Sequence, residues 1–242
     1  MNPSSLSIRT LLFCAVASLC ITPVMASEDY DDYVDEYAST DPWEPVNRAV
    51  FSFNDTVDTY SLKPIARGYN RVMPEPLNDG ISNVFRNLGE PKNLLNNTLQ
   101  GKFHDAGVDV ARFLLNSTLG VVGVFDVATR MGLQRNDEDF GQTLGAWGLD
   151  SGPYVVLPLL GPSTVRDTGG RVVDGVALVN YSQQIDHVPT RNTALGVDLI
   201  DIRAGLLSQE RLIRGDRYNF VRNAFLQNRE YKVKDGEVED TF

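Results

Sequence analysis

The chain has 242 residues, of which 42% are hydrophobic and 22% are charged, and its formal net charge at pH 7 is −10. This composition lies in the globular range and excludes a wholly disordered chain. The negative charge gives no electrostatic attraction to nucleic acid or to a bare anionic membrane surface. We therefore expect no nucleic-acid partner, and we expect any membrane contact to depend on apolar side chains or on a partner protein.

The first 26 residues have the pattern of a cleaved secretory signal peptide. Arg9 precedes an apolar stretch over residues 11–21, and residues 24–26 have the small-x-small form of a signal-peptidase site. We expect cleavage after Ala26, because the apolar stretch is too short to favour a membrane anchor. The chain is therefore predicted to be exported.

Both cysteines lie inside this signal segment. Acylation of Cys20 is the alternative to cleavage after Ala26, but the bulky Leu19 stands where a lipoprotein signal needs a small residue. Cys14 follows Phe13, which fits less well. If cleavage follows Ala26, the mature chain has no cysteine for a disulfide, a thiol nucleophile or a thiolate metal site.

Composition divides the rest of the chain into three parts. Residues 27–40 are acidic with interleaved tyrosines and are predicted to be a solvated tether, with an acidic docking tail as the alternative. Residues 41–231 show mostly helical periodicity and are predicted to form one helical domain. Residues 232–242 are predicted to be a polar C-terminal tail.

The first predicted helix of this domain follows Pro45. Its apolar residues recur at spacings of four and three, which places Val46, Val50, Phe53 and Val57 on one face. Pro64 is expected to interrupt it before a further short helix.

Further helices are predicted along the domain. Residues 76–89 and 91–101 each begin at proline and end at glycine, which indicates two short helices, and residues 102–120 indicate a longer one. Two more are expected near the C-terminus, one with Leu195, Leu199, Ile202 and Leu206 on one face and one near residues 208–228. No alternation with a period of two is long enough to indicate a sheet, so the predicted fold class is all-α.

The sequence offers no recognisable catalytic or metal site. His104 and His187 stand in no ligand spacing, and no G-x-S-x-G or nucleotide-binding loop is present. The carboxylates have structural interpretations: residues 137–139 suit a helix N-terminus, and Asp167 is spaced to pair with Arg171 on a helix. We therefore expect no enzymatic activity, no metal and no cofactor.

Five segments in order resemble one known family. They are "DPWEPVNRAVFSFN", "NLGEPKNLLNNTLQG", "ARFLLNSTLGVVGVFDVA", "DFGQTLGAWG" and "GPYVVLPLLGPSTVRDTGG". Together they are similar to the MlaA family, also called VacJ, of outer-membrane lipid-asymmetry proteins. The match is close over residues 41–174 and looser beyond. Several long motifs in order are more specific than one short signature.

The resemblance implies a single ring-shaped helical domain that lies in the outer membrane and has a central amphipathic channel. It implies that mislocalised phospholipid leaves the outer leaflet through this channel and passes to a periplasmic lipid carrier of the same pathway. It also implies a trimeric porin as a partner, the periplasmic side of the outer membrane as the location, and no catalytic residues. Family members are usually lipoproteins, so Leu19 before Cys20 is a departure that puts the lipid anchor in doubt.

Composition and resemblance together give two sets of candidate site residues. The first contains apolar residues that would face lipid or the core: Val46, Val50, Phe53, Val57, Val121, Val122, Val124, Phe125, Tyr154, Val155, Val156 and Leu157. The second contains polar residues that would make structural contacts or line the channel: Asn47, Arg48, Asn54, Asp139, Arg166 and Asp167. For the apolar segments at residues 120–125 and 154–161, a buried loop and a lipid- or partner-facing surface are both open.

Three other functions are compatible with parts of the sequence. A soluble periplasmic protein that binds lipid or another hydrophobic ligand would need no lipid anchor. An envelope enzyme such as a lipid hydrolase would need a nucleophile that the motifs do not supply. A structural outer-membrane interaction protein would have no transport role.

Overall fold

The computed structural model describes residues 40–176 and 181–237. All of them belong to one compact unit of the chain, Asp35–Phe242. The predicted signal peptide, the candidate lipidation site Cys20 and nearly all of the predicted tether lie outside the described residues. The described part is mostly helical, as predicted, and contains one short pair of strands.

The first helix does not end at Pro64. Helix α2, Glu44–Val57, continues through a π-helical segment, η3, Asp58–Leu62, into α3, Lys63–Val72. The prediction of an interruption was therefore wrong. The π-helical segment changes the spacing of the backbone hydrogen bonds just before the proline. Pro64 therefore lies in the first turn of α3, where a missing N–H is least costly.

One long helix replaces the two short ones predicted after residue 75. Helix α4, Glu75–Leu99, runs without a break past Gly89 and includes Pro91 in its interior. An interior proline costs a helix about 3 kcal/mol. Burial of several side chains of α4 against α5, Phe103–Thr118, offsets this cost. The positions of proline and glycine in the sequence do not indicate such a tertiary contact.

A tight apolar turn follows α5. Val121 and Val122 both have left-handed backbone conformations, with φ of 54° and 59°, which β-branched residues rarely adopt. Two short helices come next, α6, Val127–Arg130, and α7, Phe140–Ala146.

The segment after α7 forms a strand pair that the sequence did not predict. Strand β1, Tyr154–Leu157, pairs antiparallel with β2, Gly161–Thr164, so that Tyr154 faces Thr164. Each strand has only four residues, and Pro162 lies in β2, so no alternating pattern could develop.

The C-terminal third is helical, as predicted. The last helix begins later than residue 208, because Asp216 caps it by accepting a hydrogen bond from the amide of Tyr218. The elements of this part are α8, Val165–Val176, η4, Tyr181–Gln184, α9, Val188–Leu206, η5, Gln209–Leu212, and α10, Arg217–Val233.

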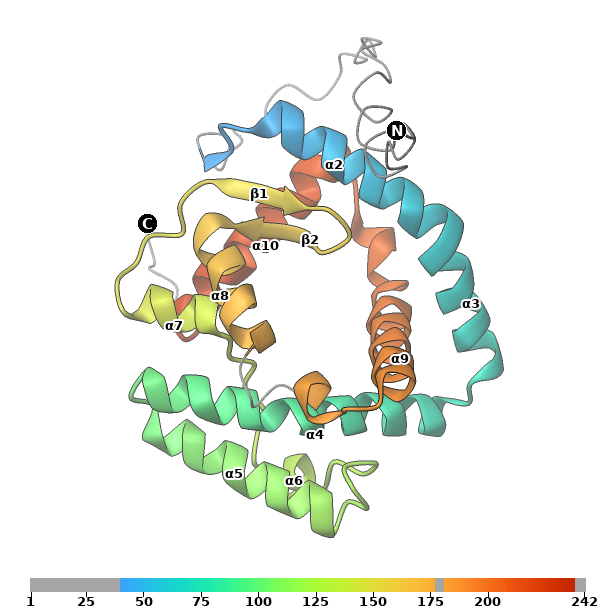
Figure 1. Cartoon of the computed structure of the whole chain (residues 1–242), viewed down its shortest axis with the longest axis vertical. Coiled ribbons are helices and arrows are strands. Elements are labelled where there is room, and N and C mark those ends of the chain that lie inside the picture. The colour runs from blue at the N-terminus through green and yellow to red at the C-terminus, as the bar shows by residue number, and fades with distance from the viewer. Residues whose placement is uncertain (1–39, 177–180, 238–242) are drawn as a thin grey trace, which may run out of the picture. The chain divides into compact units, whose positions relative to one another are not determined.

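Contacts among these elements form a closed circuit, which can be followed in Figure 1. Helix α2 contacts β1, β2 contacts α8, α8 contacts α7, and α7 contacts α4. Helix α4 then contacts α9, α9 contacts α3, and α3 returns through η3 to α2. Helix α5 packs against α4, and α10 packs against α7 and β2.

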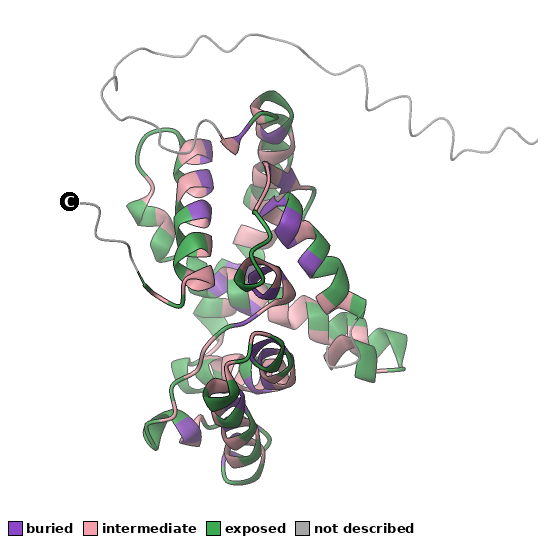
Figure 2. Ribbon diagram, turned by 90° about the vertical axis from the view of Figure 1, so that its left-hand side faces the viewer, coloured by how far each residue is buried: buried purple, intermediate pink, exposed green. Residues whose placement is uncertain are grey.

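The apolar core of this arrangement is small. Its main buried cluster consists of Tyr154, Val156, Tyr218 and Leu226, with half-buried apolar neighbours. Figure 2 shows that only short stretches of each helix are buried and that most of the helical surface is exposed or half-buried. None of the helices among the described residues combines the length and hydrophobicity needed to cross a membrane.

Candidate functional site

Asn47 joins the first helix to the strand pair. Its side chain is 2% exposed. The amide Nδ2 donates to Asp41 Oδ1 at 2.8 Å and to the Tyr154 carbonyl at 3.0 Å, and the side-chain oxygen accepts from the Val156 amide at 2.9 Å. The asparagine therefore completes the backbone hydrogen bonding of β1 on the side that β2 does not cover.

Arg48 and Asn54 make similar structural contacts along α2. Arg48 lies 4.3 Å over the Tyr218 ring and pairs with Glu44 at 2.6 Å and Asp216 at 2.7 Å. Asn54 donates to the Leu157 carbonyl at 2.9 Å and accepts from the Leu159 amide at 2.8 Å, which holds the β1–β2 turn. These side chains therefore fix the strand pair and α10 against α2.

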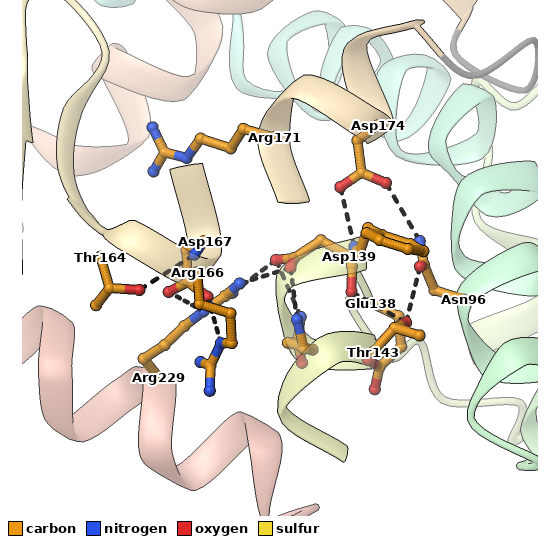
Figure 3. A network of polar contacts seen from close by, with 12 residues as sticks. Asn96, Glu138, Asp139, Thr143, Thr164, Arg166, Asp167, Arg171, Asp174 and Arg229 are labelled. Carbon is orange, nitrogen blue, oxygen red and sulfur yellow. Dashed lines mark hydrogen bonds and ion pairs between the residues drawn. The ribbon is translucent and has the colours of Figure 1, made fainter. Parts of the chain in front are cut away.

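Asp139, Arg166 and Asp167 meet in one network with Arg229 of α10 (Figure 3). Arg229 donates to both Asp139 oxygens, at 2.6 and 2.5 Å, and to Asp167 Oδ2 at 2.7 Å, while Arg166 pairs with Asp167 at 3.0 Å. Asp139 also caps α7, as its position in the sequence predicted. Burial opposes the charge on Asp139, but the Arg229 contacts prevail and hold its pKa well below the usual range.

The predicted pair between Asp167 and Arg171 was wrong. Asp167 is buried and is already occupied by Arg166 and Arg229. Arg171 instead donates to the carbonyl oxygens of Leu160 and Pro162, at 3.0 and 2.9 Å. Asp167 and Arg171 do lie four residues apart on one helix, but the Asp167 carboxylate is bound by Arg229 of the distant helix α10.

The apolar candidates fall into three groups. Tyr154 and Val156 are 0% and 3% exposed, so they belong to the core and not to a lipid-facing surface. Val50, Val57, Val124, Val155 and Leu157 are half-buried. The exposed candidates are Val46, Phe53, Val121, Val122 and Phe125.

Sequence reasoning missed the inward-facing polar side chains of α4 and α5. On α4, Asn87, Glu90, Asn93, Asn96 and Asn97 are all at most 3% exposed. On α5, Asp109, Arg112 and Asn116 are likewise buried. Their spacing of three and four repeats a helical period in polar residues, and that signal could have predicted a polar buried face.

Several large apolar side chains of the same two helices lie on the outside. Phe103, Val110 and Leu114 of α5 are 73%, 41% and 55% exposed, and Leu95 and Leu99 of α4 are also exposed. In a water-soluble helix pair this arrangement would be reversed. A polar interior with an apolar exterior matches surroundings that are themselves apolar.

Asp109 is the most perturbed acid of this polar interior. Burial, together with the charges of Glu90 and Asp105, raises its pKa to about 7, although Asn97 donates to one oxygen at 2.7 Å and Arg112 opposes the shift. Its other oxygen, Oδ1, is buried without a hydrogen-bond partner. The ionised form is therefore disfavoured at this position relative to water, and both forms are populated near neutral pH.

Replacing Asp109 by asparagine is expected to stabilise the protein more at pH 8 than at pH 5. The unfolded state releases the Asp109 proton near pH 4 and the folded state near pH 7, so wild-type stability falls as the pH rises between these values. The variant has no proton to lose, so its gain in unfolding free energy should be larger at pH 8 by about 2 kcal/mol. Thermal unfolding at both pH values measures the effect. The exposed Asp150→Asn variant is the control, and an equal change at both pH values would contradict the prediction.

A mainly apolar cavity of about 460 Å³ lies between α2, α9, α10 and the β1–β2 turn. Its lining includes Leu160, Pro162, Leu199, Ile202 and Leu206. A separate cavity of about 330 Å³ is lined by charged residues of α4, α8 and α10 and by Asp139. The β1–β2 turn therefore has an apolar cavity beside it, and Arg171 reaches the same turn from the charged cavity.

Comparison with known proteins agrees with this arrangement. The family described as "MlaA lipoprotein" matches residues 39–232. The "Intermembrane phospholipid transport system lipoprotein MlaA" of Haemophilus influenzae is 32% identical over 95% of this chain and 92% of its own. Its Escherichia coli namesake is 37% identical over 84% of this chain and 82% of its own.

A solved structure is also similar to this chain. It is described as "Structural basis for maintenance of bacterial outer membrane lipid asymmetry", has a TM-score of 0.70 and is 35% identical. The alignment covers 80% of this chain and 98% of that one. The fold is therefore shared with a protein whose structure was described in connection with lipid asymmetry.

Proposed function

Because the chain belongs to the MlaA lipoprotein family, we propose that it is a component of intermembrane phospholipid transport. In this role it removes mislocalised phospholipid from the outer leaflet of the outer membrane and thereby maintains lipid asymmetry. The observation that carries the proposal is the reversed polarity of the helix pair α4 and α5 beside the closed circuit. Buried asparagine, arginine and carboxylate side chains lie between these two helices, and large apolar side chains are exposed on them.

The reversed polarity fits the physical needs of lipid movement. A phospholipid has a charged head group and apolar tails, so its path must offer both kinds of surface. The circuit of elements supports a ring around such a path, and the exposed apolar side chains support its placement among lipid tails. Moving a lipid breaks no covalent bond, so the role requires no nucleophile.

The location and the partners belong to the same proposal. We place the protein at the periplasmic side of the outer membrane, beside a trimeric porin, where it delivers phospholipid to a periplasmic carrier. The exposed side chains of the turn after α5, among them Val121 and Val122, are proposed to contact lipid or the porin. The related proteins are named lipoproteins, whereas Leu19 before Cys20 favours an unlipidated chain cleaved after Ala26.

Deleting the gene is expected to raise the amount of phospholipid at the cell surface several-fold, and a plasmid copy should reverse the rise. The reason is that lipids reaching the outer leaflet would no longer be withdrawn. A phospholipase or amine-reactive label that cannot cross the outer membrane measures the exposed lipid. A strain that carries the empty plasmid is the control. Equal labelling in the deletion and complemented strains, with expression confirmed, would refute the transport role.

A soluble periplasmic lipid-binding protein is the second candidate. The bulky Leu19 favours it, because a protein without an anchor is free to leave the membrane, and the cavity of about 460 Å³ has the size of a small-ligand site. Fractionation separates the two candidates. A soluble carrier would be released from membranes by high salt, whereas a protein embedded among lipid tails would stay.

A further inference from the structure

Two cationic side chains in the charged cavity lack an acidic partner. Lys92 of α4 and Arg171 of α8 both line this cavity of about 330 Å³. Within residues 40–176 and 181–237, neither forms an ion pair. Figure 3 shows the Arg171 side chain extending away from the carboxylates of Asp139 and Asp174.

The acids around this cavity are already occupied. Asp139 and Asp167 are held by Arg229, and Asp167 also by Arg166. Asp174 accepts from the Phe140 amide at 3.0 Å and from Asn96 at 3.4 Å. Burial and the nearby Arg229 charge lower the pKa of Arg171, and the charges of Asp139 and Asp167 oppose this shift only in part, so an additional anion would be favoured beside it.

Arg171 also marks the boundary between two kinds of surface. Two guanidinium nitrogens donate to the carbonyls of Leu160 and Pro162, and both of these residues line the apolar cavity. The opposite side of that cavity is formed by apolar side chains of α9, including Ile202 and Leu206. The charged cavity that contains Lys92 and Arg171 therefore adjoins the apolar cavity at the β1–β2 turn.

We propose that Lys92 and Arg171 bind the phosphate group of a phospholipid whose acyl chains lie in the apolar cavity beside the β1–β2 turn. This inference rests on the proposed transport function and names its binding site. A phosphate carries the negative charge that the two cations lack, and it accepts several hydrogen bonds. In a phospholipid it is separated from the acyl chains only by glycerol, which matches the adjacency of the two cavities.

Binding of dioleoylphosphatidylglycerol to the purified protein in nonionic detergent micelles tests the site. Native mass spectrometry measures the bound fraction for wild type and for K92Q, R171Q and the double variant. Loss of a charge-assisted hydrogen bond should weaken binding by about tenfold for each single variant, and by more for the double variant. Dioleoylglycerol, which has the same chains but no phosphate, should bind all four proteins equally. The exposed Arg130→Gln variant is the matched control for loss of a positive charge.

A conservative variant separates phosphate binding from a purely structural role. Arg171→Lys keeps the charge but cannot reproduce both bonds to the carbonyls of Leu160 and Pro162. If Arg171 only stabilises the β1–β2 turn, the Arg171→Lys variant should lose phospholipid binding and thermal stability together, as R171Q does. If Arg171 binds phosphate, the variant should retain most phospholipid binding even where its unfolding temperature falls.

Three results would overturn the proposal. They are unchanged phospholipid binding by the double variant, an equal loss of dioleoylglycerol binding, and complete competition by millimolar inorganic phosphate, which would indicate a site for a free anion. The surface-labelling experiment distinguishes this failure from failure of the transport role. If the wild-type gene restores asymmetry and the double variant binds lipid normally, the proposed binding site is rejected and the transport function is retained.

Discussion

Replacing Gly170 by alanine is expected to lower the unfolding temperature by roughly 6–12 °C, which corresponds to about 3 kcal/mol in a chain of this size. Gly170 lies where α8 crosses α7. An added Cβ would come within 2.7 Å of the Gly141 Cα and closer still to the Gly141 backbone nitrogen. These are backbone atoms, so no side-chain rotation can relieve the contact, and the two helices would have to separate.

Separation of α7 from α8 would also disturb the Arg229 network. A Cβ added to Gly141 would lie 2.5 Å from Arg229 Nη2 and 2.6 Å from Asp167 Oδ1, so this crossing leaves no spare volume. The buried carboxylate of Asp167 would lose part of its pairing if the helices moved apart. The expected destabilisation therefore has a steric part and an electrostatic part.

Gly169 supplies a matched control one residue away. No atom lies within 4 Å of a Cβ at this position, so Gly169→Ala should be neutral or should stabilise the helix by up to about 1 kcal/mol. Thermal unfolding of both variants in the same detergent, followed by circular dichroism, compares them directly. Similar unfolding temperatures for the two variants would show that the helix crossing tolerates a methyl group.

Replacing Arg112 by leucine is expected to cost about 3–5 kcal/mol of folding free energy, because it leaves the carboxylate of Glu90 buried without its main partner. The side chains of Arg112 and Glu90 are 2% and 0% exposed and meet at 2.9 Å. Arg112 also donates to Thr129 Oγ1 at 3.0 Å and to Asp126 at 3.2 Å. One guanidinium therefore joins α4, α5 and the segment around α6.

A second substitution tests whether the loss comes from the unpaired charge. Adding Glu90→Gln to Arg112→Leu should recover part of the stability, because a neutral amide costs less to bury than a carboxylate. Chemical unfolding gives the free energies. The exposed Arg130→Leu variant should change the free energy by no more than about 0.5 kcal/mol. A similar loss of unfolding free energy for Arg112→Leu and Arg130→Leu would show that the buried Arg112–Glu90 pair contributes no more to stability than an exposed arginine.

The helical class and most helix positions could be predicted because they depend on local patterns. The apolar spacing after Pro45 correctly located α2, and Asp139 was correctly placed at the start of α7. The same local reasoning failed at Pro64 and Pro91, where tertiary contacts keep helices continuous through residues that usually end them.

The polar network could be predicted only in part, because its partners are far apart in the sequence. Asn47 was singled out as a structural polar residue, but nothing near it indicates a bond to Tyr154. Asp167 was assigned to the nearby Arg171, whereas Arg229 of the last helix holds it. Periodicity shows which face a residue occupies, but it does not identify the helix opposite that face.

The closed circuit also determines the order in which its contacts can form during synthesis of the chain. Asp41, at the start of the domain, makes buried contacts with Tyr218 and Arg222 of α10. A ribosome adds about 5–20 residues per second, so about 10–30 s separate the synthesis of α2 from that of α10. During that interval Asp41 has neither α10 partner, and the apolar residues of α2 that pack against α10 are uncovered. Helix α2 is therefore among the last of the described elements to complete its contacts, and its apolar residues Val50 and Phe51 remain open to aggregation until α10 has been made.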